Sequence, residues 1–296
     1  MPTYQPFIER IARVTVEVTR PNAQGAMTTF GYVFQENRMR IKVRQGGAQF
    51  GNAHVDIYGV PLADMNQIAR LWLEAMAPQN ADTLRIDVWD GKVFVPFFQG
   101  VISWSSVDAS AMPDVKLVID ANAAMPLGNT PASPYSNPGP VSTEDVLKAI
   151  VEPVGFVVDY SPTAQLLYVQ NVRLTGSPLQ QVGQFMRSFP ALTWFVNLQR
   201  LVVRQADAAF TDDPVRIAID TGLMGAPVYS TSGLQFSTVF NPQLRPGIAL
   251  DVRTNFDFVN RTKWVAAVLS HDLAPNWPGG PWTTSCAANS YGAKTQ

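Results

Sequence analysis

Two histidines, His54 and His271, are the residues of this chain with the broadest chemical repertoire. A hydrolytic Ser-His-acid triad needs a histidine that is oriented by an acid and faces a nucleophile. Ser270, His271 and Asp272 are consecutive, but neighbouring residues on a strand point to opposite faces of a sheet. The triplet therefore does not predict a triad, and we interpret His271 as a structural histidine.

Other catalytic or metal-binding patterns are equally sparse. The two histidines have no HxH or HxxxH spacing, and Cys286 is the only cysteine, so neither a cysteine-based metal site nor an intrachain disulfide is expected. No glycine-rich phosphate loop occurs, and the Gly-Gly pairs at 46–47 and 279–280 are typical of turns. We expect no cofactor, no metal and no enzymatic activity. A cell-wall-degrading or carbohydrate-active enzyme stays as the alternative, because two carboxylates distant in sequence can converge.

One charge pattern stands out in RMRIKVR at 38–44. The hydrophobic residues Met39, Ile41 and Val43 alternate with four cations, Arg38, Arg40, Lys42 and Arg44. Four like charges on one strand face repel each other unless a partner compensates them. The stripe is either a solvated outer face that protects a strand edge, or a contact face for an acidic neighbouring subunit or passing nucleic acid.

The composition favours a chain that buries surface in an assembly. The 296 residues are 46% hydrophobic and only 15% charged, where about 25% charged is typical. The net charge of −1 argues against a whole-chain nucleic-acid binder. The N-terminus is polar and broken by prolines, and no apolar run reaches the length of a membrane span. We therefore expect a protein that is made inside the cell without a leader or a membrane span.

Residues 1–123 alternate with period two over most of their length. Val14, Val16 and Val18 share one face, while PLADMNQIARLWLEAM at 61–76 has the three-to-four spacing of an amphipathic helix. Asp90-Gly91 predicts a hairpin turn, and Gly100 indicates a bulge or a close backbone approach. The order β-β-β-α-β-β-β predicts an N-terminal, closed or nearly closed barrel that is plugged by the helix.

Three further regions follow. The proline-rich stretch 124–140 is interpreted as a linker. Residues 141–206 contain two degenerate α-β-β units, whose helices begin after Ser142 and Ser177, each followed three residues later by a capping-box position. Residues 207–296 are rich in strands and predict a C-terminal barrel with an extended tail. The predicted fold class is thus mainly β with an α+β insertion.

A turn with two prolines lies in this last region, in FNPQLRPGIALDV at 240–252, and we call its residues 241–247 the corner. Prolines cannot donate a ladder hydrogen bond, so Pro242 and Pro246 predict a fixed turn between strands. We expect Pro246 to fix φ and Gly247 to adopt a backbone conformation that a β-carbon would strain.

The corner and its surroundings resemble the baseplate hub (tail hub) proteins of tailed bacteriophages. The similar segments are DTGLMGAP at 220–227, residues 233–252 and residues 264–288, with Phe240 where the family usually has an aliphatic residue. The matching positions are Gly225, Pro227, Asn241, Pro242, Pro246, Gly247, Val268, His271, Trp282 and Thr284.

The resemblance implies a non-enzymatic virion component in the phage tail baseplate, synthesised in the host cytoplasm. It implies a homotrimer in which each chain contributes two tail-tube-like barrels or split barrels to a pseudo-hexameric ring. The implied partners are the tail tube protein, the central spike protein, other baseplate proteins and a tape measure protein, with genomic DNA passing transiently through the channel. A distal tail or tube-initiator protein is a second structural alternative, which the tandem α-β-β insertion disfavours.

Overall fold

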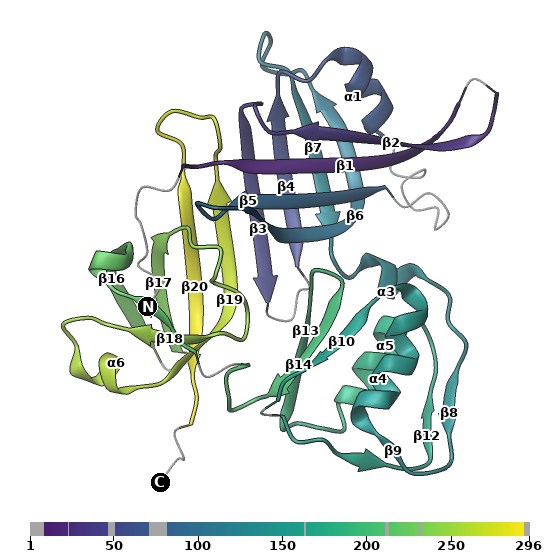
Figure 1. The fold of residues 1–296 in the computed structure, drawn as a ribbon, viewed down its shortest axis with the longest axis vertical. Helices are drawn as coiled ribbons and strands as arrows, with labels where there is room; N and C mark the ends of the chain where they lie inside the picture. Colours follow the sequence, from purple (N-terminus) through teal and green to yellow (C-terminus); the bar gives the residue numbers. More distant parts are fainter. Residues whose placement is uncertain are drawn as a thin grey trace.

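The structure is a computed structural model that describes residues 9–22, 24–46, 51–70, 82–162, 164–210, 213–230 and 233–292. Strands dominate these residues, and thirteen of the described strands join in one continuous sheet (Figure 1). The path of the sheet runs β16-β17-β20-β19-β3-β4-β7-β6-β5-β1-β2, with β15 and β18 attached beside β19. The fold is therefore mainly β, as the sequence predicts.

The N-terminal part of the sheet confirms the predicted alternation. Its strands are β1 (Ala12–Pro21), β2 (Met27–Phe34), β3 (Met39–Gly46), β4 (Asn52–Tyr58), β5 (Thr83–Trp89), β6 (Phe94–Asp108) and β7 (Lys116–Asn122). Val14, Val16 and Val18 of β1 are fully buried, as are Met39 and Ile41 of β3. Between β6 and β7, a β-carbon on Gly100 would lie 2.8 Å from the carbonyl of Asn122. The predicted close backbone approach at Gly100 is thus confirmed.

No closed barrel forms among the described residues. The first half of the long strand β6 pairs with β5 and its second half pairs with β7, so the sheet turns a corner along β6. As a result β1 and β5 cross over β3, β4 and β7 (Figure 1), and their side chains share one hydrophobic core. The two strands that would have to meet for closure do not pair, because β3 bonds to β19 instead of β2.

Helix α1 (Leu62–Ile68) lies against this folded sheet and buries Met65 and Ile68. The helix predicted over 61–76 is shorter than expected, because α1 ends at Ile68, Ala69 is extended, and the backbone N–H of Arg70 donates to the carbonyl of Ser105. Residues 71–81 lie outside the described residues.

The C-terminal strands extend the same sheet. They are β15 (Val215–Ile217), β16 (Leu223–Ser230), β17 (Gly233–Val239), β18 (Ala249–Val252), β19 (Trp264–Leu273) and β20 (Trp282–Ser290), with the short helices η3 (Ile219–Thr221) and α6 (Asp257–Arg261). They bury a second core around Trp264, Phe236 and Leu244. Antiparallel pairing of β19 with β3 makes the two parts of the sheet continuous.

The middle of the chain packs two helices beside a small sheet. Its elements are β9 (Val141–Ser142), α4 (Thr143–Val151), η2 (Glu152–Val154), β10 (Val157–Tyr160), β11 (Tyr168–Val169), β12 (Val172–Leu174), α5 (Pro178–Met186), β13 (Leu192–Asn197) and β14 (Arg200–Gln205). Ser142 and Ser177 cap α4 and α5 as predicted, the latter in a full capping box. The two units differ in pairing, because β13 and β14 form a hairpin, whereas β11 pairs with β9 and not with β10. Instead, β10 pairs in parallel with β14.

The proline-rich stretch 124–140 holds regular structure rather than only a spacer. It contains α3 (Met125–Asn129) and β8 (Tyr135–Asn137), which pairs with β12. Pro126 occupies the first turn of α3, where a missing N–H costs nothing, and Leu127 is fully buried. The domain boundaries at 123, 140 and 206 stay predictions, but the stretch itself packs against the rest of the chain.

Candidate functional site: the polar face of the sheet

The most distinctive surface is the face of the sheet that points away from the core. On β3, β4 and β7 the odd-numbered side chains are buried, so the even-numbered ones point outward. We call this outward face of β16, β17, β20, β19, β3, β4, β7 and the second half of β6 the polar face. Its residues are exposed or half-buried at most positions.

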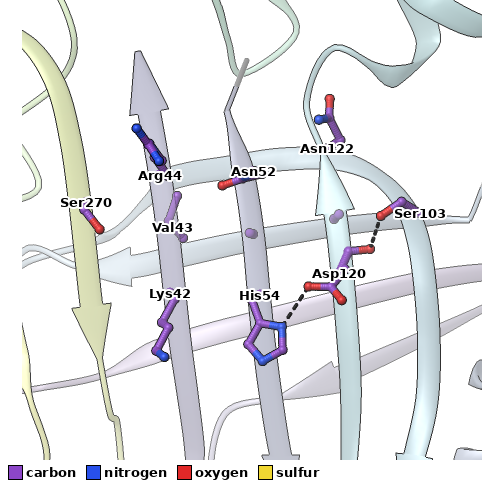
Figure 2. A pocket seen from close by; sticks show the side chains of 11 residues that line it. Lys42, Val43, Arg44, Asn52, His54, Ser103, Asp120, Asn122 and Ser270 are labelled. Carbon is purple, nitrogen blue, oxygen red and sulfur yellow. Dashed lines mark hydrogen bonds and ion pairs between the residues drawn. The ribbon is translucent and has the colours of Figure 1, made fainter. Parts of the chain in front are cut away.

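Strand register aligns the side chains of the polar face in two transverse rows. The first, which we call the donor row, crosses six strands and consists of Ser237, Ser285, Ser270, Arg44, Asn52 and Asn122. The second, the charged row, lies one pleat further along and consists of Asp272, Lys42, His54 and Asp120. Figure 2 shows the parts of both rows that line a hollow of about 300 Å³, namely Ser270, Arg44, Asn52 and Asn122 of the donor row and Lys42, His54 and Asp120 of the charged row. The donor row contains a single charge, that of Arg44.

The predicted basic stripe is divided by the structure into two halves. Arg38 forms an ion pair with Asp114 at 3.3 Å, and its guanidinium group stacks on the rings of Tyr58 and Trp277. Arg40 binds Asp272 with both guanidinium nitrogens, at 2.9 and 3.2 Å. These two cations are therefore compensated within the chain.

Lys42 and Arg44 make up the other half of the stripe. Both are exposed, and neither has an ion-pair partner within the described residues. Both alternatives for the stripe, a solvated face and a contact face, are thus confined to Lys42 and Arg44.

His54 is the centre of an ionic cluster on β4 and β7. Its Nδ1 lies 2.7 Å from Asp120 and its Nε2 lies 3.6 Å from Asp56. Hydrogen bonding to Asp56 raises the pKa of His54, and Asp120 adds to this effect against the opposing influence of burial. Burial by itself would raise the pKa of Asp56, but His54 and Lys116 together hold that pKa below its usual range. The cluster can hold a proton on His54, but among the described residues no hydroxyl group is hydrogen-bonded to its ring.

His271 lies on the opposite face of the sheet, in the core. Ser270 is exposed on the polar face while His271 is buried, so the expectation that these neighbours diverge is confirmed. The Nδ1 atom of His271 lies 2.9 Å from the hydroxyl of Thr284, and burial lowers the pKa of the imidazole to about 3. Its ring packs edge-on against Phe97 and Phe240, with centroids 4.7 and 5.6 Å away. His271 is thus a neutral histidine in an aromatic cluster.

The Pro242–Pro246 corner consists of two turns in succession. Asn241 accepts the backbone N–H of Gln243 with its side chain and that of Leu244 with its carbonyl. The next turn runs from Arg245 to Ile248, and Gly247 has φ 84°, which confirms the conformation predicted for it.

The corner is buried within the chain. A β-carbon on Gly247 would lie 3.3–3.4 Å from Arg204 and Phe195, which belong to β14 and β13. A β-carbon on Gly46 of β3 would lie 3.2 Å from Pro246. The corner thus sits where the C-terminal strands, the middle sheet and β3 meet. Pro246 and Gly247, at the end of the corner, are buried by this chain.

The remaining positions of the family motif are spread over the C-terminal strands. Gly225 has φ 71° and lies with Pro227 in the irregular stretch of β16, where no atom would touch an added β-carbon on Gly225. Trp282 packs edge-on against Phe240, with a centroid distance of 5.5 Å, and so joins the cluster around His271. The motif therefore combines core positions with an exposed strand irregularity, and does not converge on one site.

Neither a metal-binding cluster nor a membrane-spanning helix is found in the part of the chain that the structure describes. No group of three or more histidine, cysteine or acidic side chains is placed there to hold a metal ion. None of its helices has both the length and the apolar character that crossing a bilayer requires. Cys286 is buried, and burial raises the pKa of its thiol to about 12.

The comparison with family models identifies the class of protein. The model of the baseplate hub gp41 family matches residues 85–276, which include most of the continuous sheet and the whole middle region. The chain belongs to this baseplate hub family and is a structural component of the phage-tail type. No curated protein matches the chain in sequence.

Solved structures with the same fold come from phage tails and a secretion system. The 43 kDa tail protein of prophage MuSo2 from Shewanella oneidensis is 8% identical, with a TM-score of 0.62 over 94% of this chain and 96% of that one. A tail protein of Neisseria meningitidis MC58 is 11% identical, with a TM-score of 0.62 over 95% and 96%. The E. coli c3393 protein, a type VI secretion component described as similar to T4 tail proteins gp27 and gp5, is 11% identical, with a TM-score of 0.56 over 86% and 74%.

Sequence reasoning had singled out only one strand of the polar face. It missed Asn52, His54, Asp120 and Asn122 as members of a common surface, and it missed Ser270 beside Arg44. The available signal was that β4 and β7 also have polar residues at alternate positions. The order of the strands could not be predicted from the sequence, because strands that lie side by side, such as those of Ser270 and Arg44, are far apart in it.

Proposed function

We propose that the protein is a homotrimeric hub that joins the hexameric tail tube to the trimeric central spike, and that its polar face forms the wall of the channel through which DNA is ejected. The family and the tail-protein fold support a baseplate position. The observation that carries the channel assignment is the polar face itself, a broad sheet surface that stays uncovered by the described residues.

The charge on this face is balanced, as a channel for a polyanion requires. The cations and carboxylates on the polar face are equal in number, namely Arg40, Lys42, Arg44 and Lys116 against Asp56, Asp108, Asp120 and Asp272. On β17 and β20 the face continues as the uncharged side chains Gln235, Ser237, Thr283 and Ser285. A strongly cationic wall would retain DNA by neutralising its phosphates, whereas a balanced and hydroxyl-rich wall stays hydrated and releases it.

The order of the strands supports a match between threefold and sixfold symmetry. The polar face takes four strands from the N-terminal part of the sheet (β3, β4, β7 and β6) and four from the C-terminal part (β19, β20, β17 and β16). Each chain thus offers two four-stranded units, and three chains offer six. A ring built in this way presents one such unit to each subunit of a sixfold tube.

The two lateral limits of the polar face carry exposed apolar side chains. On β16 these are Met224 and Val228, in register with Ser237 and Gln235, and on the second half of β6 it is Trp104, in register with Asp120. Strand β16 is uncharged and pairs on only one side within the described residues. Uncharged, apolar edges are aggregation hazards unless another chain covers them, so we assign both limits to contacts between subunits.

We further propose that the protein has no enzymatic activity. The two histidines occupy environments with opposite effects on their pKa, and neither is hydrogen-bonded to both a nucleophile and an acid among the described residues. This arrangement favours structural roles for both over general acid-base catalysis.

Assembly is the decisive test. Multi-angle light scattering of the full chain, alone and with its tube and spike proteins, should give a species of three times the 32.4 kDa chain mass, and negative-stain images should show a threefold ring. Val228→Asp on β16 should shift the protein to monomers while leaving its thermal melt unchanged. Val157→Asp, an equally exposed strand valine in the middle sheet, is the matched control and should still trimerise. A protein that stays monomeric with both partners present would refute the proposal.

A further inference from the structure

The cations of the polar face differ in whether a carboxylate of the same chain lies beside them. Arg40 and Lys116 each have a carboxylate within 4 Å, at 2.9 and 3.1 Å respectively. Lys42 and Arg44, on the same strand as Arg40, have none among the described residues and are both exposed. Because the chain has few charges, we interpret two neighbouring cations without a carboxylate partner as a place where another molecule supplies the negative charge.

These two cations line the hollow seen in Figure 2. The other polar side chains that line it are Asn52, His54, Ser103, Asp120, Asn122 and Ser270, of which only Asp120 is a carboxylate. The side chains of Asn52 and Ser270 lie in register on either side of Arg44 and have no hydrogen-bond partner in the described part of the chain. The nearest carboxylates are already engaged, because Asp272 binds Arg40 and Asp120 binds His54. The hollow therefore presents free positive charge and free donors.

We propose that this hollow binds an acidic peptide segment of a partner protein. Lys42 and Arg44 are two residues apart on one strand, so their side chains emerge roughly 7 Å from each other. An extended peptide with carboxylates on alternate residues has the same spacing and can satisfy both cations at once. Its backbone carbonyls can accept hydrogen bonds from Asn52 and Ser270. The proposal names the partner chemistry of the channel wall, and it rests on the proposed function only for the place of the hollow in the assembly.

A peptide fits the hollow better than nucleic acid does. Duplex DNA carries one negative charge per about 1.7 Å of axis and is held by many cations along its backbone. Here only two free cations are present, and DNA lying across them would also approach the carboxylates of Asp120 and Asp272. A narrow chain with a few placed carboxylates can reach the cations and avoid the acids.

The test is a binding titration on the full chain at 0.15 M salt, read by fluorescence anisotropy. The probes are a labelled peptide of alternating aspartate and serine, the same peptide with asparagine in place of aspartate, and a labelled 12-base-pair duplex. The variant Lys42→Gln/Arg44→Gln is compared with the charge-matched control Lys92→Gln/Arg173→Gln, whose residues are exposed elsewhere. We expect the acidic peptide to bind wild type and control alike and to lose about tenfold or more in affinity in the Lys42/Arg44 variant.

Three outcomes would overturn the proposal: equal binding of the aspartate and asparagine peptides, equal affinity of wild type and the Lys42/Arg44 variant, or tighter binding of the duplex with the same dependence on these two cations. Light scattering on the same samples separates this result from the proposed function. A trimer that binds no acidic peptide would refute the peptide site alone, whereas a monomer that binds it would refute the hub assembly alone.

Discussion

The buried imidazole of His271 makes the stability of the protein sensitive to acid. Its pKa falls from 6.5 to about 3 because burial disfavours the charged ring. Between these values the unfolded chain binds a proton that the folded chain does not, so the free energy of unfolding falls as the pH decreases from about 6.5 toward 3. From pH 7.5 to 5.0 the two pKa values give a loss of about 2 kcal/mol from this one residue.

Urea unfolding at pH 7.5 and 5.0 measures this loss, with the variant His271→Phe/Thr284→Val as the comparison. The double substitution keeps an aromatic ring against Phe97 and Phe240 and removes both members of the hydrogen bond, so no buried polar atom is stranded. Carboxylates titrate in both proteins, so the difference between their pH dependences isolates His271. The reasoning is refuted if both proteins lose the same free energy, or if NMR titration of the folded protein places the imidazole pKa above 5.

Two further expectations concern Gly247 and His54. Gly247→Val should lower the free energy of unfolding by about 1–3 kcal/mol, because it strains a positive φ and crowds Arg204 and Phe195, whereas Gly225→Val strains a similar φ in open space and should cost less. Equal losses in urea unfolding would show that packing at the corner contributes nothing. Asp120→Asn should lower the raised pKa of His54 toward its ordinary value, as measured by NMR titration. Because the folded pKa is raised, protonated His54 stabilises the fold fully below pH 6.5, and this stabilisation is lost as the pH rises through the folded pKa. The substitution should make this stabilising contribution smaller. An unchanged pKa would assign the shift to Asp56 alone.

Local features of the fold were predictable because they depend on neighbouring residues. The alternation of Val14, Val16 and Val18 identified a strand and its buried face, and Ser142 and Ser177 identified two helix starts. The conformation of Gly247 followed from the Pro-Gly pair, which permits few turns.

Long-range features were not predictable, because they depend on pairings that leave no local pattern. A barrel was expected for residues 1–123, but β3 pairs with β19, whose Asp272 is 232 residues from Arg40. The polar face depends on the same pairing, since it brings Ser270 beside Arg44. The proline-rich stretch was interpreted as a linker because its few apolar residues, among them the buried Ala124 and Leu127, follow no helical or strand periodicity.

The pairing of β3 with β19 also limits how early the continuous sheet can form during synthesis. A chain emerging from the ribosome exposes the outer edge of β3 until the strand at 264–273 has been synthesised, so this central ladder of the sheet cannot form until most of the chain has been made. Pairing between strands so far apart in sequence slows folding, and until it occurs the unpaired edge of β3 can bind other strands. The cations that alternate along β3 discourage the nascent edge from pairing with the wrong strand. A premature stop anywhere before residue 264 would leave that edge open permanently, and we expect truncated hubs to aggregate rather than to be incorporated into tails.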